Sequence, residues 1–356
     1  MAFSVSHGEE NPGKTLPRHI TMRRGTANDE FATFDVMRRT MNYEMHWSHH
    51  GAMRQHLRTS PHASFWLAEE TPRFGSPRVI GYARSVIRDR VWHLTEFFVL
   101  PNHHKQGIGS ALLKQCLADG EAAGADTHLV LASQHPGADA LYLRLAGCIP
   151  RLPMMLLAGP LTSLKLSDPA SAHILDPRVP PDSPALTASA ETPDTLIAEP
   201  LILTPEIHTA LDALDRDIVG YARPNDHVLW ESEMGGARGA SRLFRRKTAG
   251  FPGDAGSIVG YAYLGPHSSG PALALAPNDL PRMITHVAAI ARRSVPRDFP
   301  LLQPLDHYWA MAGINEVMLR WLLGCGWQIV FQYLFMSSRP LGRLDRYVCH
   351  NPLYLP

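Results

Sequence analysis

Two stretches of the chain repeat the same short patterns in the same order, and this constrains the fold more than any single motif. Val79–Ala83 (VIGYA) matches Ile258–Ala262 (IVGYA) about 180 residues later, and Ala146–Cys148 (AGC) matches Cys325–Trp327 (CGW) at the same offset. Matches at similar offsets and in the same order favour a duplication over coincidence among common strand sequences. In a chain of 356 residues we therefore expect two domains of one fold.

Composition suggests where these domains begin and end. We expect a flexible arm at residues 1–19 and a first domain at 20–160. A linker rich in Pro, Ala and Ser follows at 161–198, and a second domain at 199–356. The proline-dense run Pro177–Pro184 inside the linker fits neither a helix nor a central strand.

Charge and hydropathy exclude several classes of protein. Hydrophobic residues make up 45% of the chain, charged residues 19%, and the net charge is +1, which is ordinary for a globular protein and gives no basic field for nucleic acid. The first residues lack the basic start and apolar core of a signal peptide. No apolar run reaches the about 20 residues of a membrane span. We expect a cytoplasmic protein with no nucleic-acid or membrane partner.

Cysteines and clustered histidines predict no metal site. No CxxC pair occurs among the four cysteines, which are Cys116, Cys148, Cys325 and Cys349. Free thiols in a reducing compartment are the expected state. His46 and His50, in a cluster with His49, have the i, i+4 spacing of a helical zinc site, but Trp47 and Ser48 offer no ligand and no Cys lies near in sequence.

The first domain, residues 20–160, alternates strand and helix patterns around one turn that contains two glycines. Apolar and β-branched runs predict strands at 20–24, 63–69, 79–86, 91–100, 128–132 and 149–157, and three-to-four spacing predicts helices at 27–41, 107–123 and 138–145. His104–Ser110 (HKQGIGS) leads into the second of these helices. A helix start offers unpaired N–H groups and a positive dipole end, so this turn suits a pyrophosphate, although glycines there can also have a purely steric reason.

The residues around this turn resemble the central motif of the GNAT acetyltransferase superfamily. The run 96–113 (EFFVLPNHHKQGIGSALL) is similar to the family's strand ending in V-x-P, followed by R/Q-x-x-G-x-G/A and an apolar helix. The run 135–148 (HPGADALYLRLAGC) resembles the second landmark, N-x-x-A-x-x-L/F-Y-x-x-x-G-F. The resemblance implies an α/β fold of the α+β type, with a mixed, mostly antiparallel twisted sheet flanked by helices. His104 and His135 depart from the family's usual Arg or Gln and Asn.

The resemblance also implies that acetyl-CoA is the co-substrate. In the family it lies where two central strands splay apart at a bulge, here expected near Phe98 and Val99. Backbone groups at the bulge contact the pantetheine arm, and those of the turn hold the pyrophosphate. The implied cofactor-binding residues are Phe98, Val99, Leu100, His104, Lys105, Gln106, Gly107, Ile108, Gly109, Ser110 and His135.

Two catalytic residues follow from the same resemblance. Glu96 lies where many relatives carry a carboxylate, and we expect it to act as the base, through water, that frees the attacking amine. The alternative is a carboxylate that only shapes the acceptor pocket. Tyr142 lies where relatives carry the tyrosine that protonates the departing thiolate, the alternative being a packing role. The family's variable helices, here with Tyr43, Trp47 and His49, border the acceptor.

The second block keeps the fold signal and loses the cofactor turn. Ala276–Asn278 (APN) answers Leu100–Asn102 (LPN), but no R/Q-x-x-G-x-G follows, and Pro281 falls in the expected first helical turn. We therefore expect a degenerate GNAT half that walls the acceptor site, and one acetyl-CoA per chain. Four residues could line such a wall, namely Asp215, Arg223, Asp226 and His227. The alternative is that they are solvated or cap helices.

The function implied by the resemblance is an N-acetyltransferase. It would move an acetyl group from acetyl-CoA to a primary amine of a small-molecule acceptor, by direct attack in a ternary complex. One alternative is a protein or peptide N-acetyltransferase, and another is a non-catalytic acyl-CoA-binding regulatory module. Release of free CoA with a panel of amines separates the last from the first two.

Overall fold

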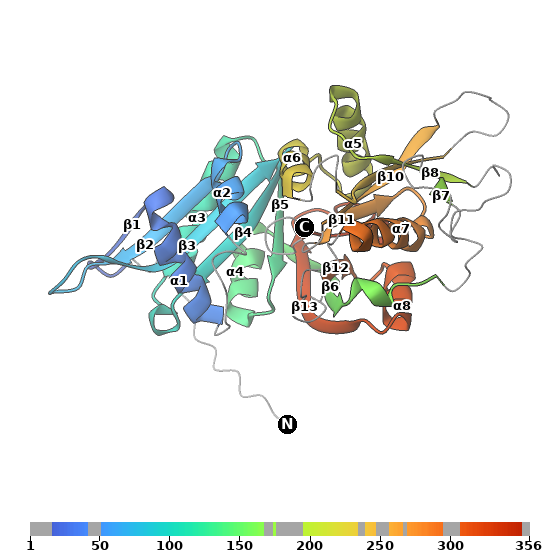
Figure 1. The fold of residues 1–356 in the computed structure, drawn as a ribbon. Coiled ribbons are helices and arrows are strands. Elements are labelled where there is room, and N and C mark those ends of the chain that lie inside the picture. Colours follow the sequence, from blue (N-terminus) through green and yellow to red (C-terminus); the bar gives the residue numbers. More distant parts are fainter. Residues whose placement is uncertain are drawn as a thin grey trace. The chain divides into compact units, whose positions relative to one another are not determined.

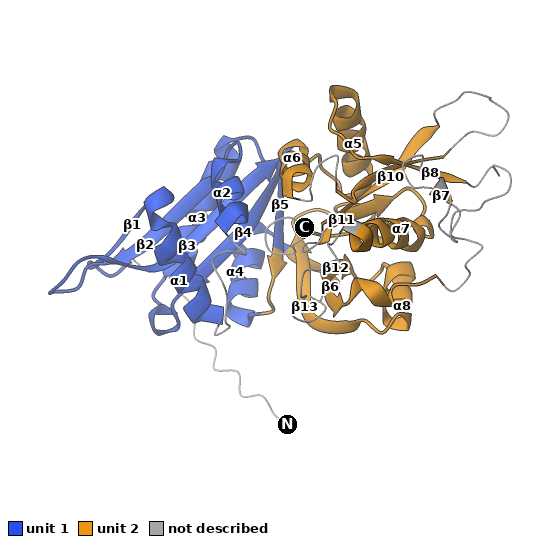
Figure 2. Ribbon diagram, viewed as in Figure 1, with its two compact units in different colours: residues 1–130, 135–148 blue, residues 131–134, 149–356 orange. Residues whose placement is uncertain are grey.

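The chain forms two compact units, each built from sheet and helices (Figure 2). The computed structural model describes residues 16–41, 51–166, 174–175, 195–233, 239–246, 256–265, 269–294 and 307–350. Unit 1 comprises residues 1–130 and 135–148, and unit 2 comprises residues 131–134 and 149–356. Mostly antiparallel sheets flanked by helices confirm the predicted fold class. The boundaries predicted from composition, including the linker at 161–198, stay a prediction.

In unit 1, strands and helices follow the predicted order. The strands are β1 (Ile20–Arg24), β2 (Ser64–Glu70), β3 (Arg78–Arg88), β4 (Val91–Val99) and β5 (Thr127–Ala132), the last two residues of β5 belonging to unit 2. The helices are α1 (Glu30–Met41), α2 (Gly51–Thr59), α3 (Ile108–Ala122) and α4 (Pro136–Ala146), with 3-10 turns η1 (Ala27–Asp29) and η3 (Pro101–His103). Only α2 has no counterpart among the helices predicted from the sequence.

Strands β1 to β4 pair antiparallel in chain order, and β4 pairs with β5 in parallel. Helix α3 packs against β2, β3 and β4, and α1 against β3 and β4 (Figure 1). Trp92 on β4 donates its indole N–H to the Cys116 carbonyl of α3 at 3.0 Å. An added Cβ at Gly120 of α3 would lie 2.4 Å from the Trp92 ring. The tryptophan therefore fixes where α3 sits on the sheet.

Unit 2 contains two sheets. Its strands are β6 (Ile149–Gly159), β7 (Ile174–Leu175), β8 (Leu196–Pro200), β9 (Arg242–Arg246), β10 (Ser257–Leu264), β11 (Ser269–Ala274), β12 (His307–Ala312), β13 (Gln328–Ser337) and β14 (Tyr347–Val348). Its helices are α5 (Pro205–Ile218), α6 (Pro224–Glu233), α7 (Asp279–Ser294) and α8 (Glu316–Gly324), with 3-10 turns η4 (Leu161–Ser163) and η7 (Leu344–Arg346). One sheet has the order β14-β11-β10-β9-β8-β7, and in the other β6 lies between β12 and β13.

Strand β6 follows α4 directly in the chain but completes a sheet of unit 2, antiparallel to both neighbours. The stacked rings of Trp309 and Trp327, with centroids 4.9 Å apart, lie at its end. An added Cβ at Gly159 would lie 2.6 Å from the Trp327 ring. The glycine thus lets the indole pair pack onto β6.

The repeated Gly-Tyr-Ala sequence has one physical reason in both units. Gly81 on β3 and Gly260 on β10 each lie against the backbone of the next strand, where an added Cβ would approach the carbonyl oxygens of Phe98 at 3.0 Å and Leu273 at 2.4 Å. The tyrosine after each glycine is fully buried. A close approach between consecutive strands therefore recurs at the equivalent place of each unit, as a duplication predicts.

We predict that Gly260→Ala lowers the free energy of unfolding by about 1–3 kcal/mol, because the methyl group overlaps the β11 backbone. The matched control is Gly324→Ala, at a helical glycine with no atom within 4 Å of the added Cβ, which should change it by less than about 1 kcal/mol. Urea denaturation followed by circular dichroism measures both. Equal midpoints for the two variants would contradict the assignment.

Candidate functional site

Strands β4 and β5 stop pairing midway along β4. Their parallel ladder ends where Leu94 pairs with Val130, and Thr95 is an extra residue in the β3–β4 register. The bulge predicted near Phe98 and Val99 is therefore wrong in position. A bulge is set by how two strands pair, and the sequence of β4 alone does not encode that.

The bulge redirects every later side chain of β4. Residues two apart on a strand normally share a face, but the extra Thr95 places Leu94 and Glu96 on opposite faces. Glu96 pairs across from Arg84; Glu96 contacts Arg54 of α2, and Arg84 contacts Glu30 of α1. Phe97 is left facing α3 and α4, against Gly109 and Tyr142.

The glycine-punctuated turn forms as predicted. Lys105 and Gly107 have positive φ angles of 61° and 84°, and the first helical bond of α3 runs from the Ala111 N–H to the Gly107 carbonyl at 3.0 Å. Gly107 is the N-cap and makes no side-chain cap. The first-turn N–H groups, for which a helix has no internal acceptor, belong to Ile108, Gly109 and Ser110. This is the arrangement that binds anions at helix starts.

The two glycines of the turn have different physical reasons. Gly107 adopts a left-handed conformation that favours glycine. At Gly109 an added Cβ would lie 3.1 Å from Cζ of Phe97 and 3.4 Å from Cδ1 of Leu141. Gly109 therefore allows α3 to pack closely on Phe97, a steric role that the spacing alone did not distinguish from phosphate contact.

The remaining predicted cofactor-binding residues adjoin this turn. Phe98 and Val99 lie in β4, and Leu100 continues the strand by donating its N–H to Ile80 at 2.9 Å. His104 Nε2 lies 2.8 Å from the Val99 carbonyl oxygen. Gln106 donates to the Asn102 carbonyl at 3.4 Å. His135 caps α4 by accepting from the Ala138 N–H at 3.3 Å, and its ring centroid lies 5.9 Å from that of His104.

Tyr142 presents its ring to Phe97 edge-on, with centroids 5.8 Å apart. The ring is buried, and none of the residues described here gives its hydroxyl a hydrogen bond. Burial, followed by the nearby charge of Asp139, raises the pKa of the phenol. The hydroxyl therefore keeps its proton at neutral pH and is available as a donor.

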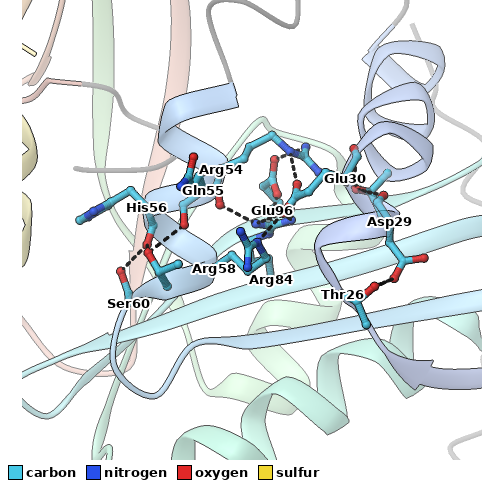
Figure 3. A network of polar contacts seen from close by, with 12 residues as sticks. Thr26, Asp29, Glu30, Arg54, Gln55, His56, Arg58, Ser60, Arg84 and Glu96 are labelled. Atoms are coloured by element: carbon cyan, nitrogen blue, oxygen red, sulfur yellow. Dashed lines mark hydrogen bonds and ion pairs between the residues drawn. The ribbon is translucent and has the colours of Figure 1, made fainter.

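Glu96 is held by two arginines in a buried network (Figure 3). Its Oε1 lies 2.7 Å from Nη1 of Arg54, and its Oε2 lies 3.0 Å from Nε of Arg84. Both arginines also contact Glu30, at 3.0 Å each. All four side chains are nearly or wholly buried, and Tyr82 meets Arg54 at 3.3 Å. The network ties α1 and α2 to β3 and β4.

This arrangement bears on the two readings of Glu96. A general base needs a free lone pair directed at a proton or a water. Oε1 of Glu96 instead accepts a hydrogen bond from Nη1 of Arg54 at 2.7 Å, and Oε2 forms an ion pair with Nε of Arg84 at 3.0 Å, so the carboxylate has structural partners. The contacts support the pocket-shaping alternative, while the role of base stays a prediction.

The equivalent helix start in unit 2 already carries an anion. Asp279 begins α7 and is 3% exposed. Its oxygens accept from Arg246 at 2.7 and 2.9 Å and from Arg282 at 3.3 Å. Pro281 lies in the first turn, as predicted. A carboxylate thus satisfies the positive end of α7, at the position where α3 has a glycine turn.

The acidic and basic residues before the β9–β10 pair are neither solvated nor exposed as a wall. Asp215, Arg223 and His227 are buried, with Asp215 2.9 Å from Nε of Arg223 and 3.0 Å from Nε2 of His227. Tyr261 donates to Asp215 at 2.7 Å. Burial opposes ionisation, but the charges of Arg223 and His227 lower the pKa of Asp215 to about 2. Asp226 is buried as well, so the expectation of solvated residues was wrong.

Some expectations fall outside the part of the chain that the structure describes. Tyr43, His46, Trp47, His49 and His50 all lie at positions 42–50, for which no placement is given. Within the described ranges, no group of His, Cys, Asp or Glu side chains has the geometry of a metal site. In the same ranges no helix is long and apolar enough to cross a membrane.

Comparison with solved structures finds similar folds over nearly the whole chain. A proposed acetyltransferase from Pyrococcus horikoshii is 13% identical with a TM-score of 0.63, covering 98% of this chain and 99% of that one. A tandem GNAT protein from the clavulanic acid biosynthesis pathway is 15% identical with a TM-score of 0.52, covering 90% and 99%. A GCN5-related N-acetyltransferase from Sphaerobacter thermophilus is 14% identical with a TM-score of 0.50, covering 93% and 100%.

Sequence comparison places the family signal in the first half. No curated protein sequence matches the chain. Residues 31–147 match the model of the acetyltransferase (GNAT) family, and this range contains the β4–α3 turn, Glu96 and Tyr142. Residues 31–147 therefore match the GNAT family, and over most of its length the chain has a fold similar to those of solved acetyltransferases, a tandem GNAT protein among them.

Proposed function

We propose that the chain is an N-acetyltransferase that moves an acetyl group from acetyl-CoA to a primary amine of a small-molecule acceptor in the cytoplasm. The observation that carries the proposal is the glycine turn at the start of α3. It follows directly on the part of β4 that β5 has left. Helix-start N–H groups and a free strand edge are what a diphosphate and a pantetheine arm each require.

The residues of unit 1 divide the binding of acetyl-CoA between them. The end of β4, at Phe98, Val99 and Leu100, would receive the pantetheine arm, with the backbone groups of Val99 directed to the strand edge. The turn from His104 to Ser110 would hold the diphosphate, with Gly107 allowing the left-handed backbone that turns the N–H groups outward. His135 adds an imidazole beside His104. The chain would hold one acetyl-CoA, because the carboxylate of Asp279 already occupies the start of α7.

The reaction forms a C–N bond and breaks the thioester C–S bond. The acceptor amine attacks in a ternary complex, and a backbone N–H on the free edge of β4 stabilises the charge that develops on the carbonyl oxygen. The amine loses a proton to a base, for which Glu96 acting through water is one candidate, and the departing thiolate gains one. Tyr142 supplies that second proton, since its hydroxyl is protonated and has no acceptor among the described residues.

Two other functions remain as alternatives. A protein or peptide N-acetyltransferase would use the same site with a different acceptor, and an acyl-CoA-binding regulatory module would bind acetyl-CoA without turnover. The test is release of free CoA from acetyl-CoA, detected with a thiol reagent, with a panel of small amines and peptides. Turnover with small amines supports the proposal, turnover with peptides alone supports the first alternative, and binding without turnover supports the second.

We predict that Tyr142→Phe lowers turnover about 10²–10⁴-fold, because it removes the acid and keeps the ring against Phe97. Acetyl-CoA affinity should change little. Steady-state kinetics at saturating acetyl-CoA, beside calorimetry, separate the two effects. The control is Tyr333→Phe, which removes a buried phenol of unit 2. Near-wild-type turnover in Tyr142→Phe would reduce this residue to packing.

We predict that Gly107→Glu abolishes measurable acetyl-CoA binding, because it adds both a negative charge and a side chain at a φ of 84°. Gly107→Asn is the matched control, since asparagine tolerates the left-handed conformation and is neutral, so it should retain binding. Calorimetry of the wild type should give one site per chain. Unchanged affinity in Gly107→Glu, or a stoichiometry of two, would contradict the site.

We predict that Glu96→Gln lowers the free energy of unfolding by about 3–5 kcal/mol, because it leaves two buried guanidinium groups short of a counter-charge. The control is Glu316→Gln, whose pair with Arg320 is exposed and should contribute less than about 0.5 kcal/mol. Denaturant unfolding measures both. The opposite outcome is a Glu96→Gln protein with the stability of the wild type but without turnover. If the pH dependence of turnover that a base produces is lost as well, Glu96 is the base.

A further inference from the structure

His104 joins the end of β4 to the turn before α3. Its Nε2 donates a hydrogen bond to the Val99 carbonyl oxygen at 2.8 Å. Leu100, the next residue, donates its N–H to Ile80 of β3. Neighbouring residues of a strand direct their backbone polar groups to opposite sides. The Val99 carbonyl therefore points to the edge of β4 that β5 has left, and the imidazole of His104 lies on that edge.

The bond to Val99 fixes what a neutral His104 can do. A carbonyl oxygen only accepts, so Nε2 carries the hydrogen, and Nδ1 of a neutral ring is then an acceptor. A phosphate oxygen is an acceptor too, so a neutral ring cannot bond to phosphate while it holds Val99. An imidazolium has a donor on each nitrogen and can hold both at once.

The other side chains of the turn do not take the place of His104 at the strand edge. Lys105 follows it and is exposed. His103 precedes it but is buried, with Nδ1 2.8 Å from Oδ1 of Asn102 and Nε2 3.4 Å from a carboxylate oxygen of Glu70 on β2. The ring of His103 thus faces away from the strand edge, and His104 is the histidine of the turn directed there.

The groups of α4 near this imidazole are His135 and, beyond it, Asp139. The His135 ring lies edge-on to His104. Its Nδ1 accepts from the Ala138 N–H, so in this arrangement that nitrogen carries no proton. Asp139 interacts electrostatically with His135. A second positive charge on His135 would repel an imidazolium at His104.

We propose that His104 takes up a proton from solvent when acetyl-CoA binds, and that the imidazolium then bridges the Val99 carbonyl and a diphosphate oxygen. This inference rests on the proposed acetyl-CoA site. It makes affinity depend on pH, rising by up to about tenfold for each unit that pH falls while the free ring is neutral. A glutamine or arginine at position 104, the residues usual in the family, would donate to phosphate without a change in protonation.

The test is calorimetry of acetyl-CoA binding at pH 7.5 in PIPES and in imidazole, two buffers with different heats of ionisation. The difference in measured heat gives the number of protons taken up. We expect about one for the wild type and about none for His104→Gln, with His104→Arg as a second variant. His135→Asn tests whether the neighbouring histidine takes the proton instead, and a variant that still binds acetyl-CoA should show the uptake. Acetyl-dephospho-CoA should also keep it, which excludes titration of the ligand's 3′-phosphate.

Binding without proton uptake in the wild type would overturn the inference and leave the proposed function standing. The same uptake in His104→Gln as in the wild type would assign the proton to another group and overturn it as well. Loss of uptake in His135→Asn alone would move the role to His135. Absence of any acetyl-CoA binding by the wild type would overturn the proposed function itself, so the two failures are distinguishable.

Discussion

Two buried arginines shared between two glutamates hold unit 1 together around its site. Taking such charges out of water costs several kcal/mol for each ion, and this is offset only where every charge is closely paired. Arg54 and Arg84 each contact both Glu30 and Glu96, so helices α1 and α2 cannot shift on β3 and β4 without leaving a charge unpaired. The geometry of the sheet face opposite α3 depends on this set.

The bulge at Thr95 makes the network and the candidate active site compatible. By turning Glu96 toward the arginines and Phe97 toward α3 and α4, it separates a charged face from an apolar one on a single strand. Tyr142 packs on the apolar face, where burial keeps its proton in place. The proton donor and the carboxylate therefore lie on opposite sides of β4, and an acceptor amine approaching the free edge of the strand would meet them from different directions.

The sequence was sufficient for features that local residues determine. The turn from His104 to Gly109 and the start of α3 both depend on glycine conformation and helix starts, which operate over a few residues. The bulge was misplaced because pairing between strands decides it. Arg54 and Arg84 were missed, although an arginine inside the apolar run of β3 (VIGYARSVI) was a signal for a buried partner.

Partners distant in sequence also explain the error in unit 2. Asp215, Arg223 and His227 were expected to be solvated or capping because charged and polar side chains are mostly exposed, and only the fold brings Tyr261 against them. Tyr261 occupies in its repeat the place that Tyr82 has in unit 1, and both meet an arginine–carboxylate pair. The duplicated strand thus kept a tyrosine for a buried ionic network while the charged residues around it changed.

A single substitution would not create a cofactor turn in unit 2. Replacing Asp279 with glycine would uncover the α7 helix start, but it would leave Arg246 and Arg282 without their carboxylate. Neither the residues before α7 nor Pro281 would supply the left-handed glycine that opens the turn in unit 1. A phosphate placed there would meet two arginines but no row of outward N–H groups. In unit 2 a carboxylate of the protein itself lies at the positive end of the helix, paired with two arginines, so the fold there needs no bound anion.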